Sequence, residues 1–221
     1  VKNIELNAAF ATIANEGEYV KPKFYTRILD HDGNVLLENE KETSQVLKPT
    51  TAWLLTSAME DVVTKGTGGR VRFDGMTIAG KTGTTSDEND VWFAGFTPYY
   101  TCTTWAGFDN NVDLKSGDEA NLAKTIWRET MKRIHEGLED PGFPMPAGIT
   151  TAVVCNKSGK LAVDGMCTLD GSAHSEYYAE GTVPQEACNV HALGQVWALT
   201  GLVASDTCPY RTAGVVTGIG Y

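Results

Sequence analysis

Apolar residues recur at helical spacing near the start of the chain. Leu6, Phe10 and Ile13 form one stripe. Asn3 before them can cap a helix, and Asn15-Glu16-Gly17 after them provides a stop. The pattern predicts a short amphipathic helix over these residues.

Two later stretches also predict helices. Residues 50–65 have apolar side chains at helical spacing and end at Gly66. Residues 121–138 carry a stripe that we expect to cover one face of a sheet. The members of that stripe are Leu122, Ile126, Trp127, Met131 and Ile134.

Shorter runs rich in β-branched and aromatic residues predict strands. Asp32-Gly33 lies between the runs 24–29 and 35–37, and this dipeptide between apolar runs is typical of a β-hairpin. Further along, turn residues separate three more runs, which predict an antiparallel meander. These runs are 76–79, 91–96 and 101–108.

The pattern changes after residue 140. Residues 141–146 are rich in Pro and Gly and predict a linker, and residues 147–221 contain short β-type runs with little helical pattern. We therefore expect an α+β fold in residues 1–140, with an antiparallel sheet and flanking helices. A small β-rich module, held by disulfides, is expected to follow.

Composition excludes several classes of protein. Hydrophobic residues make up 42% and charged residues 21% of the 221, as in globular proteins, so fibrous and disordered classes are excluded. No run approaches the roughly 18 apolar residues of a membrane span. The formal net charge of -10 repels phosphate backbones, which argues against a nucleic-acid partner.

The candidate chemistry lies between Gly75 and Asp90, and above all in residues 75–85. Residues 75–82 match the phosphate-binding pattern G-x-x-x-x-G-K-T. However, the four intervening residues are Met, Thr, Ile and Ala, which favour a strand, and a turn sequence follows Thr82 where that motif needs a helix. We therefore rank nucleotide binding below a second interpretation, the K-T-G element of serine acyl-transfer enzymes.

In that second interpretation each residue type has a chemical reason. The Lys81 ammonium can lie near both a nucleophile and an anionic substrate. Thr82 and Thr84 project to the same side of a strand and can offer hydroxyls to a carboxylate. Gly83 between them lets a substrate backbone approach closely. The Thr84 amide can serve as an oxyanion donor.

Several blocks of sequence give this tripeptide a context. In the first 140 residues these blocks are Ile4–Gly17, Tyr19–Pro22, Lys65–Gly68, Ala79–Thr85, Asp90–Pro98 and Trp105–Asn110. In the tail they are Cys155 and residues 158–162, 181–184 and 188–191. The first set resembles the transpeptidase domain of class A, bifunctional, penicillin-binding proteins, and the tail resembles the C-terminal extension of Gram-positive members. The resemblance implies that Lys81 and Thr84 take part in catalysis, and that Thr82, Gly83, Thr84 and Thr85 bind substrate.

The family's other two catalytic elements are missing from this sequence. None of the eight serines has Lys three positions later, so the S-x-x-K nucleophile is absent. Ser86-Asp87-Glu88 is unlike the S-x-N element, which precedes the K-T-G strand in the family. The resemblance therefore implies the C-terminal part of a larger peptidoglycan D,D-transpeptidase, and we expect these residues to be inactive by themselves.

The resemblance also implies a location and partners. The parent protein would be anchored in the membrane through a missing N-terminal part, would carry a glycosyltransferase domain, and would act at the extracytoplasmic face on stem peptides or β-lactams. It implies no cofactor. Family members complete a five-stranded sheet with two strands from before the nucleophile, so we expect an open edge at residues 101–108 and self-association through it.

The cysteines leave two interpretations open. Extracytoplasmic proteins favour disulfides, and order along the chain makes Cys155 with Cys167 and Cys188 with Cys208 the simplest pairing. The Cys188-x-x-His191 spacing, near Cys155, Cys167 and His174, also suits zinc. We prefer the disulfides and expect no metal, and we expect Cys102 to be a buried free thiol.

A different class of function also fits this composition. An acidic, disulfide-held extracellular module could bind wall polymer or a partner protein without catalysis. The nature of the sequence upstream of residue 1 would separate the two classes, because an enzyme needs S-x-x-K there.

Overall fold

The chain forms two units in a computed structural model. The structure describes residues 1–110, 112–114, 117–200 and 202–217. Contacts divide the chain into Val1–Ala147 and Gly148–Tyr221, and each unit is considered by itself below.

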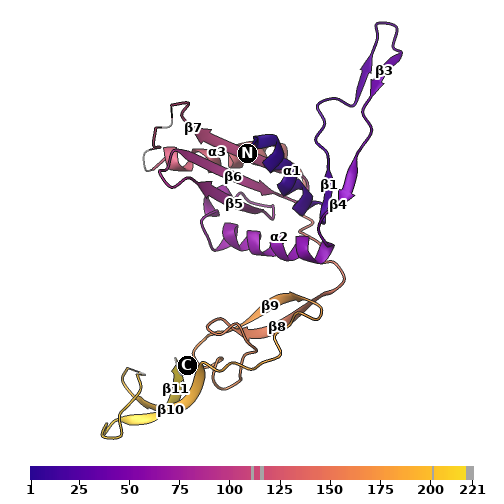
Figure 1. The fold of residues 1–221 in the computed structure, drawn as a ribbon. Coiled ribbons are helices and arrows are strands. Elements are labelled where there is room, and N and C mark those ends of the chain that lie inside the picture. Colours follow the sequence, from indigo (N-terminus) through magenta and orange to yellow (C-terminus); the bar gives the residue numbers. More distant parts are fainter. Residues whose placement is uncertain (111, 115–116, 201, 218–221) are drawn as a thin grey trace. The chain divides into compact units, whose positions relative to one another are not determined.

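The first unit contains a three-stranded antiparallel sheet in the order β5-β6-β7 (Figure 1). The strands are β5 (Ala79–Thr84), β6 (Asp90–Phe96) and β7 (Thr101–Gly107). Short turns join them, which confirms the predicted meander. The first strand differs from the predicted run 76–79, since it begins only at Ala79 and continues to Thr84. The reason is that its pairing with β6 starts with Ala79 opposite Phe96.

Three α-helices pack on this sheet, namely α1 (Asn3–Ala14), α2 (Pro49–Thr64) and α3 (Leu122–Ile134). Single 3-10 turns precede β5 and α3, at Gly69–Val71 and Glu119–Asn121. All three helices confirm the sequence pattern. Lys2, in place of Asn3, is the residue that precedes the first helix.

Alternation along β6 explains which helix covers which face. Phe93 packs with Trp127 of α3, whereas Phe96 packs with Met59 of α2 and Phe10 of α1. Residues an odd number of positions apart in a strand point to opposite faces. The sheet therefore lies between α3 on one face and α1 on the other, while α2 runs along the β5 side (Figure 1).

The buried side of α3 differs from the predicted stripe. Ala123, Trp127 and Met131 are fully buried, whereas Ile126 and Ile134 are 43% and 46% exposed. Buried residues four positions apart lie on one helix face. Small Ala123 faces the sheet because the Thr104 hydroxyl of β7 donates to its carbonyl at 2.8 Å, which requires close approach.

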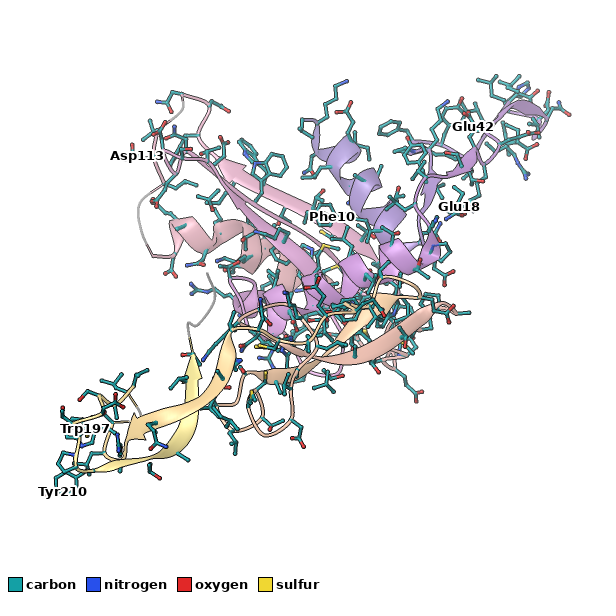
Figure 2. All side chains as sticks on the ribbon, turned by 60° about the horizontal axis from the view of Figure 1, so that its bottom comes forward. Phe10, Glu18, Glu42, Asp113, Trp197 and Tyr210 are labelled. Atoms are coloured by element: carbon teal, nitrogen blue, oxygen red, sulfur yellow. The ribbon has the colours of Figure 1, made fainter. Side chains whose placement is uncertain are left out.

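A ribbon of two strand pairs projects from the first unit (Figure 1). At its base β1 (Glu18–Val20) pairs with β4 (Thr43–Gln45), and at its tip β2 (Arg27–Leu29) pairs with β3 (Val35–Glu38). The tip confirms the predicted hairpin. Its side chains extend into solvent beyond Glu18 and Glu42, which Figure 2 labels on the ribbon.

Residues 141–146 are packed on the first unit. The Phe143 ring meets the Phe96 ring edge to face at 5.5 Å, and its carbonyl accepts a hydrogen bond from Trp53 Nε1 at 3.3 Å. The Pro and Gly residues that suggested a linker therefore lead the chain across the first unit before it reaches the second.

The second unit is built from two antiparallel hairpins. In one, β8 (Ile149–Cys155) pairs with β9 (Ala173–Ala179), and in the other β10 (His191–Trp197) pairs with β11 (Arg211–Thr217). Its described residues contain no helix, so the β-rich prediction for this region is confirmed.

Candidate functional site

Two facing glycines position the strand that carries the candidate site. Gly80 of β5 is paired with Gly95 of β6. A Cβ added to either would lie 2.6 Å or 2.7 Å from the ring of Phe93, which is fully buried. The absence of both side chains therefore lets this ring pack beneath the strand immediately before Lys81.

Lys81, Thr82, Gly83 and Thr84 all lie on β5, as the K-T-G interpretation requires. The exposed Lys81 ammonium donates to the Thr82 carbonyl at 3.0 Å. The Thr82 and Thr67 hydroxyl oxygens are 3.0 Å apart. Thr67 lies in the glycine-rich segment after α2, where the sequence pattern predicted only the end of a helix. Its contact with Thr82 could not be predicted from the sequence, because it depends on how α2 packs beside β5.

An open cleft of about 370 Å³ lies beside β5. Leu6 and Phe10 of α1 face Lys81 and Gly83 across it. Trp92 and Ala94 of β6 add further apolar lining. A chain bound along β5 would thus find a cation and backbone groups on one side and an apolar wall on the other.

The remaining predicted site residues lie beyond this cleft. Thr84 and Thr85, both described by the structure, are exposed and do not line it. Thr85 instead holds the turn into β6: its hydroxyl accepts the Asp90 N–H at 3.0 Å, and its own N–H donates to the Asp90 carbonyl at 3.2 Å. The Asp90 carboxylate also accepts a hydrogen bond from Trp105 Nε1 at 2.7 Å, which links β6 to β7.

The structure does not support the phosphate-loop interpretation of residues 75–82. The motif's Lys and Thr lie within β5, and a turn to β6 follows. Within residues 75–110, all of which are described, no helix begins. The helix N-terminus that would face a phosphate is therefore missing at this place.

The cysteines differ from the expected disulfides. All five, each within the described residues, are free thiols. Cys155, Cys167 and Cys188 are buried together with His191, and their sulfur atoms and an imidazole nitrogen lie within 4.8 Å of one another. Cys208 lies outside this group. The expected pair Cys155 and Cys167 therefore lies beside Cys188 and His191, whereas Cys188 does not meet its expected partner Cys208.

Electrostatics favour a thiolate at Cys188 of this Cys/His cluster, whereas burial raises the pKa of the neighbouring Cys167 thiol. Burial by itself raises the pKa of the Cys188 thiol, but hydrogen bonds from Ser158 and His191 outweigh it and lower that pKa to about 6. Cys102 behaves differently, since burial raises the pKa of its thiol. It is half-buried and free, close to the expectation.

Two family models of known proteins match this chain. Residues 1–132 match the penicillin binding protein transpeptidase domain, and residues 145–193 match the penicillin-binding protein 1A C-terminal domain. Penicillin-binding protein 1A of Clostridium botulinum is 35% identical over 91% of this chain and 24% of its own length. Penicillin-binding protein 2D of Bacillus subtilis is 33% identical over 85% of this chain and 28% of its own length. The chain thus spans about a quarter of these relatives.

Solved structures share the fold. Penicillin-binding protein 1A from Haemophilus influenzae superposes with a TM-score of 0.73 at 22% identity, over 86% of this chain and 33% of its own. Penicillin-binding protein 3 from Mycobacterium tuberculosis, complexed with ampicillin, superposes with a TM-score of 0.51 at 24% identity, over 66% of this chain and 38% of its own. The match to residues 1–132, together with a K-T-G strand in the expected place, shows that the chain belongs to the penicillin-binding protein transpeptidase domain family.

Proposed function

We propose that this chain is part of a peptidoglycan D,D-transpeptidase that is acylated by β-lactams. The observation that carries the proposal is the Lys81-Thr82-Gly83-Thr84 segment, which lies on β5 beside an open cleft. In the proposed reaction a serine oxygen attacks the carbonyl of the penultimate D-Ala, terminal D-Ala leaves, and an acceptor amine then takes the acyl group from the serine.

The strand residues have distinct roles in this proposal. The Lys81 ammonium supplies positive charge where the nucleophile and the substrate carboxylate meet. Thr82 and Thr84 offer hydroxyls to that carboxylate, and the Thr84 N–H is one oxyanion donor. Thr67 holds the Thr82 hydroxyl at 3.0 Å and thereby orients it. Gly83 leaves the substrate backbone room to approach.

In this proposal the nucleophile comes from another part of the protein. None of the eight serines in residues 1–221 precedes a lysine by three positions. In S-x-x-K enzymes that lysine lies beside the serine as a base. These residues therefore supply one wall of the active site.

Penicillin labelling tests the proposal. We expect the full-length protein, incubated with a fluorescent penicillin, to gain one adduct at the acyl-ester mass. Incubated in the same way, residues 1–221 are expected to keep their unmodified mass. Intact mass spectrometry measures both. A full-length protein that stays unmodified would refute the proposal, and an adduct on the short chain would refute the external nucleophile.

We also propose that the parent protein is anchored in the membrane, carries a glycosyltransferase domain and works at the extracytoplasmic face. The family resemblance supports this arrangement. Among the helices that the structure describes, none is sufficiently long and apolar to span a membrane. Protease treatment of intact cells, followed by immunoblotting with an antibody to residues 1–221, tests it. We expect the protease to remove the antibody signal without lysis of the cells.

We further propose that β7 mediates self-association. Among the described strands it pairs only with β6, and its hydrogen bonds with α1 each involve a side chain: Asn7 Nδ2 donates to the Thr101 carbonyl at 3.5 Å, and the Thr103 hydroxyl donates to the Asn3 carbonyl at 3.4 Å. Unpaired strand edges promote pairing between copies. We expect the sedimentation coefficient of the 221-residue chain to rise with concentration. A constant monomer value over that range would contradict the proposal.

A further inference from the structure

The Cys/His cluster of the second unit combines residues from four places in its sequence. Cys155 ends β8 and His191 begins β10, while Cys167 and Cys188 lie in the loops before β9 and β10. At most 8% of any of the four residues is exposed. The fold therefore brings three thiols and one imidazole together away from solvent.

The distances within the cluster match tetrahedral coordination. His191 Nδ1 lies 3.2 Å from the sulfur of Cys188, 3.4 Å from that of Cys167 and 3.6 Å from that of Cys155. Zinc bonds of about 2.3 Å to sulfur and about 2.0 Å to nitrogen, at tetrahedral angles, separate the two ligand atoms by about 3.5 Å. A single ion therefore fits between the four ligand atoms.

The outer nitrogen of His191 has the partner that a metal-binding histidine requires. His191 Nε2 lies 2.8 Å from Asp170 Oδ2, and Lys157 Nζ lies 2.7 Å from that same oxygen. A carboxylate that accepts the Nε2 proton leaves the Nδ1 lone pair directed at the sulfurs, and such pairs orient metal-binding histidines. Lys157 holds the carboxylate in place.

Backbone groups also support the sulfur atoms. The Val163 N–H donates to the Cys167 sulfur at 3.3 Å. The Ser172 hydroxyl oxygen lies 3.6 Å from the Cys155 sulfur, and the hydroxyl proton is donated to the Cys167 carbonyl at 3.2 Å, so Ser172 is fixed beside the cluster. Hydrogen bonds to sulfur stabilise thiolates, which are the form that binds metals.

Among its described residues, the core of the second unit lacks large apolar side chains. The three cysteines form its buried cluster, with partly buried Ala162, Val163, Ala173 and Val190 around them. The other buried apolar residues described in this unit are Val154, Val196 and Val216. Small modules with so little apolar core are commonly held together by a metal or by disulfides.

From this geometry we propose that Cys155, Cys167, Cys188 and His191 bind one structural zinc ion. Four protein ligands close the coordination sphere, which is typical of structural sites and leaves no position for a substrate. Thiolate-rich tetrahedral sites favour zinc among the common divalent ions. Asp170 is a positioning residue that acts through His191.

Metal analysis of the purified full-length protein tests the proposal. We expect about one zinc ion per chain by inductively coupled plasma mass spectrometry. Cys188→Ser is expected to lose most of the zinc, whereas Cys208→Ser, which removes a cysteine outside the cluster, should retain it. A metal-free wild-type protein, or equal loss in both variants, would overturn the assignment.

Two further measurements do not depend on the folding of a ligand variant. Cobalt substituted into the wild-type protein should show the visible bands of tetrahedral thiolate coordination. Asp170→Asn should bind zinc about 10- to 100-fold more weakly in competition with a chromophoric chelator. Octahedral cobalt spectra, unchanged affinity in Asp170→Asn, or a disulfide between two cluster cysteines in non-reducing peptide mapping would each contradict the site.

Discussion

Replacing Lys81 with methionine in the full-length protein is expected to slow its acylation by a penicillin about 10²- to 10³-fold. This is the usual effect of removing one group that stabilises charge in an acyl-transfer site. Methionine keeps an unbranched side chain but removes the positive charge. Since Lys81 is exposed and its bond is to the neighbouring Thr82 carbonyl, we expect the fold to persist.

Stopped-flow or quenched labelling gives the second-order acylation rate constant for this comparison. Lys132→Met on α3 is the matched control, because Lys132 is also exposed but lies outside the cleft. We expect the control to react at the wild-type rate. Equal acylation rate constants for Lys81→Met and wild type would show that Lys81 has no role in the proposed acylation.

Replacing Trp127 with alanine is expected to destabilise the first unit by about 3 to 5 kcal/mol, as for other fully buried aromatic residues. Trp127 is 0% exposed, and its ring meets Phe93 edge to face at 5.1 Å. Its Nε1 also donates to the Cys102 carbonyl at 3.0 Å. The substitution thus leaves a cavity and removes a hydrogen bond between α3 and β7.

Urea unfolding of the 221-residue chain, followed by circular dichroism at the helix band, measures this loss. All helices that the structure describes lie in the first unit, so the signal reports on that unit. Ile126→Ala is the control on the same helix, because Ile126 is 43% exposed. We expect the control to change stability by less than about 1 kcal/mol. Similar losses in both variants would show that α3 does not pack as described.

Local patterns predicted most of the secondary structure of the first unit. Asp32-Gly33 indicates its hairpin because a tight turn depends on two adjacent residues. Gly66 similarly marks the end of α2, and the K-T-G tripeptide lies on a strand as expected. These features depend on neighbouring residues, so sequence is enough to locate them.

The side of a helix that becomes buried depends on its tertiary neighbours. In the α3 sequence, apolar residues lie at helical spacing both from Ile126 and from Ala123, so the pattern permits a buried stripe through either residue. Contacts with Thr104 and Cys102 of β7 select the second. Similarly, Thr67 meets Thr82 only after α2 packs beside β5.

The cysteines show the same division most clearly. Residue types and the Cys188-x-x-His191 spacing identify two chemistries, disulfide or zinc, and they cannot choose between them. The choice depends on where the sulfurs of Cys155 and Cys167 lie relative to one imidazole, after loops of many residues have closed. The sequence alone determines the family, the strand motif and the available ligands. Only tertiary packing decides which of those ligands meet, because their separation in space does not follow from their separation along the chain.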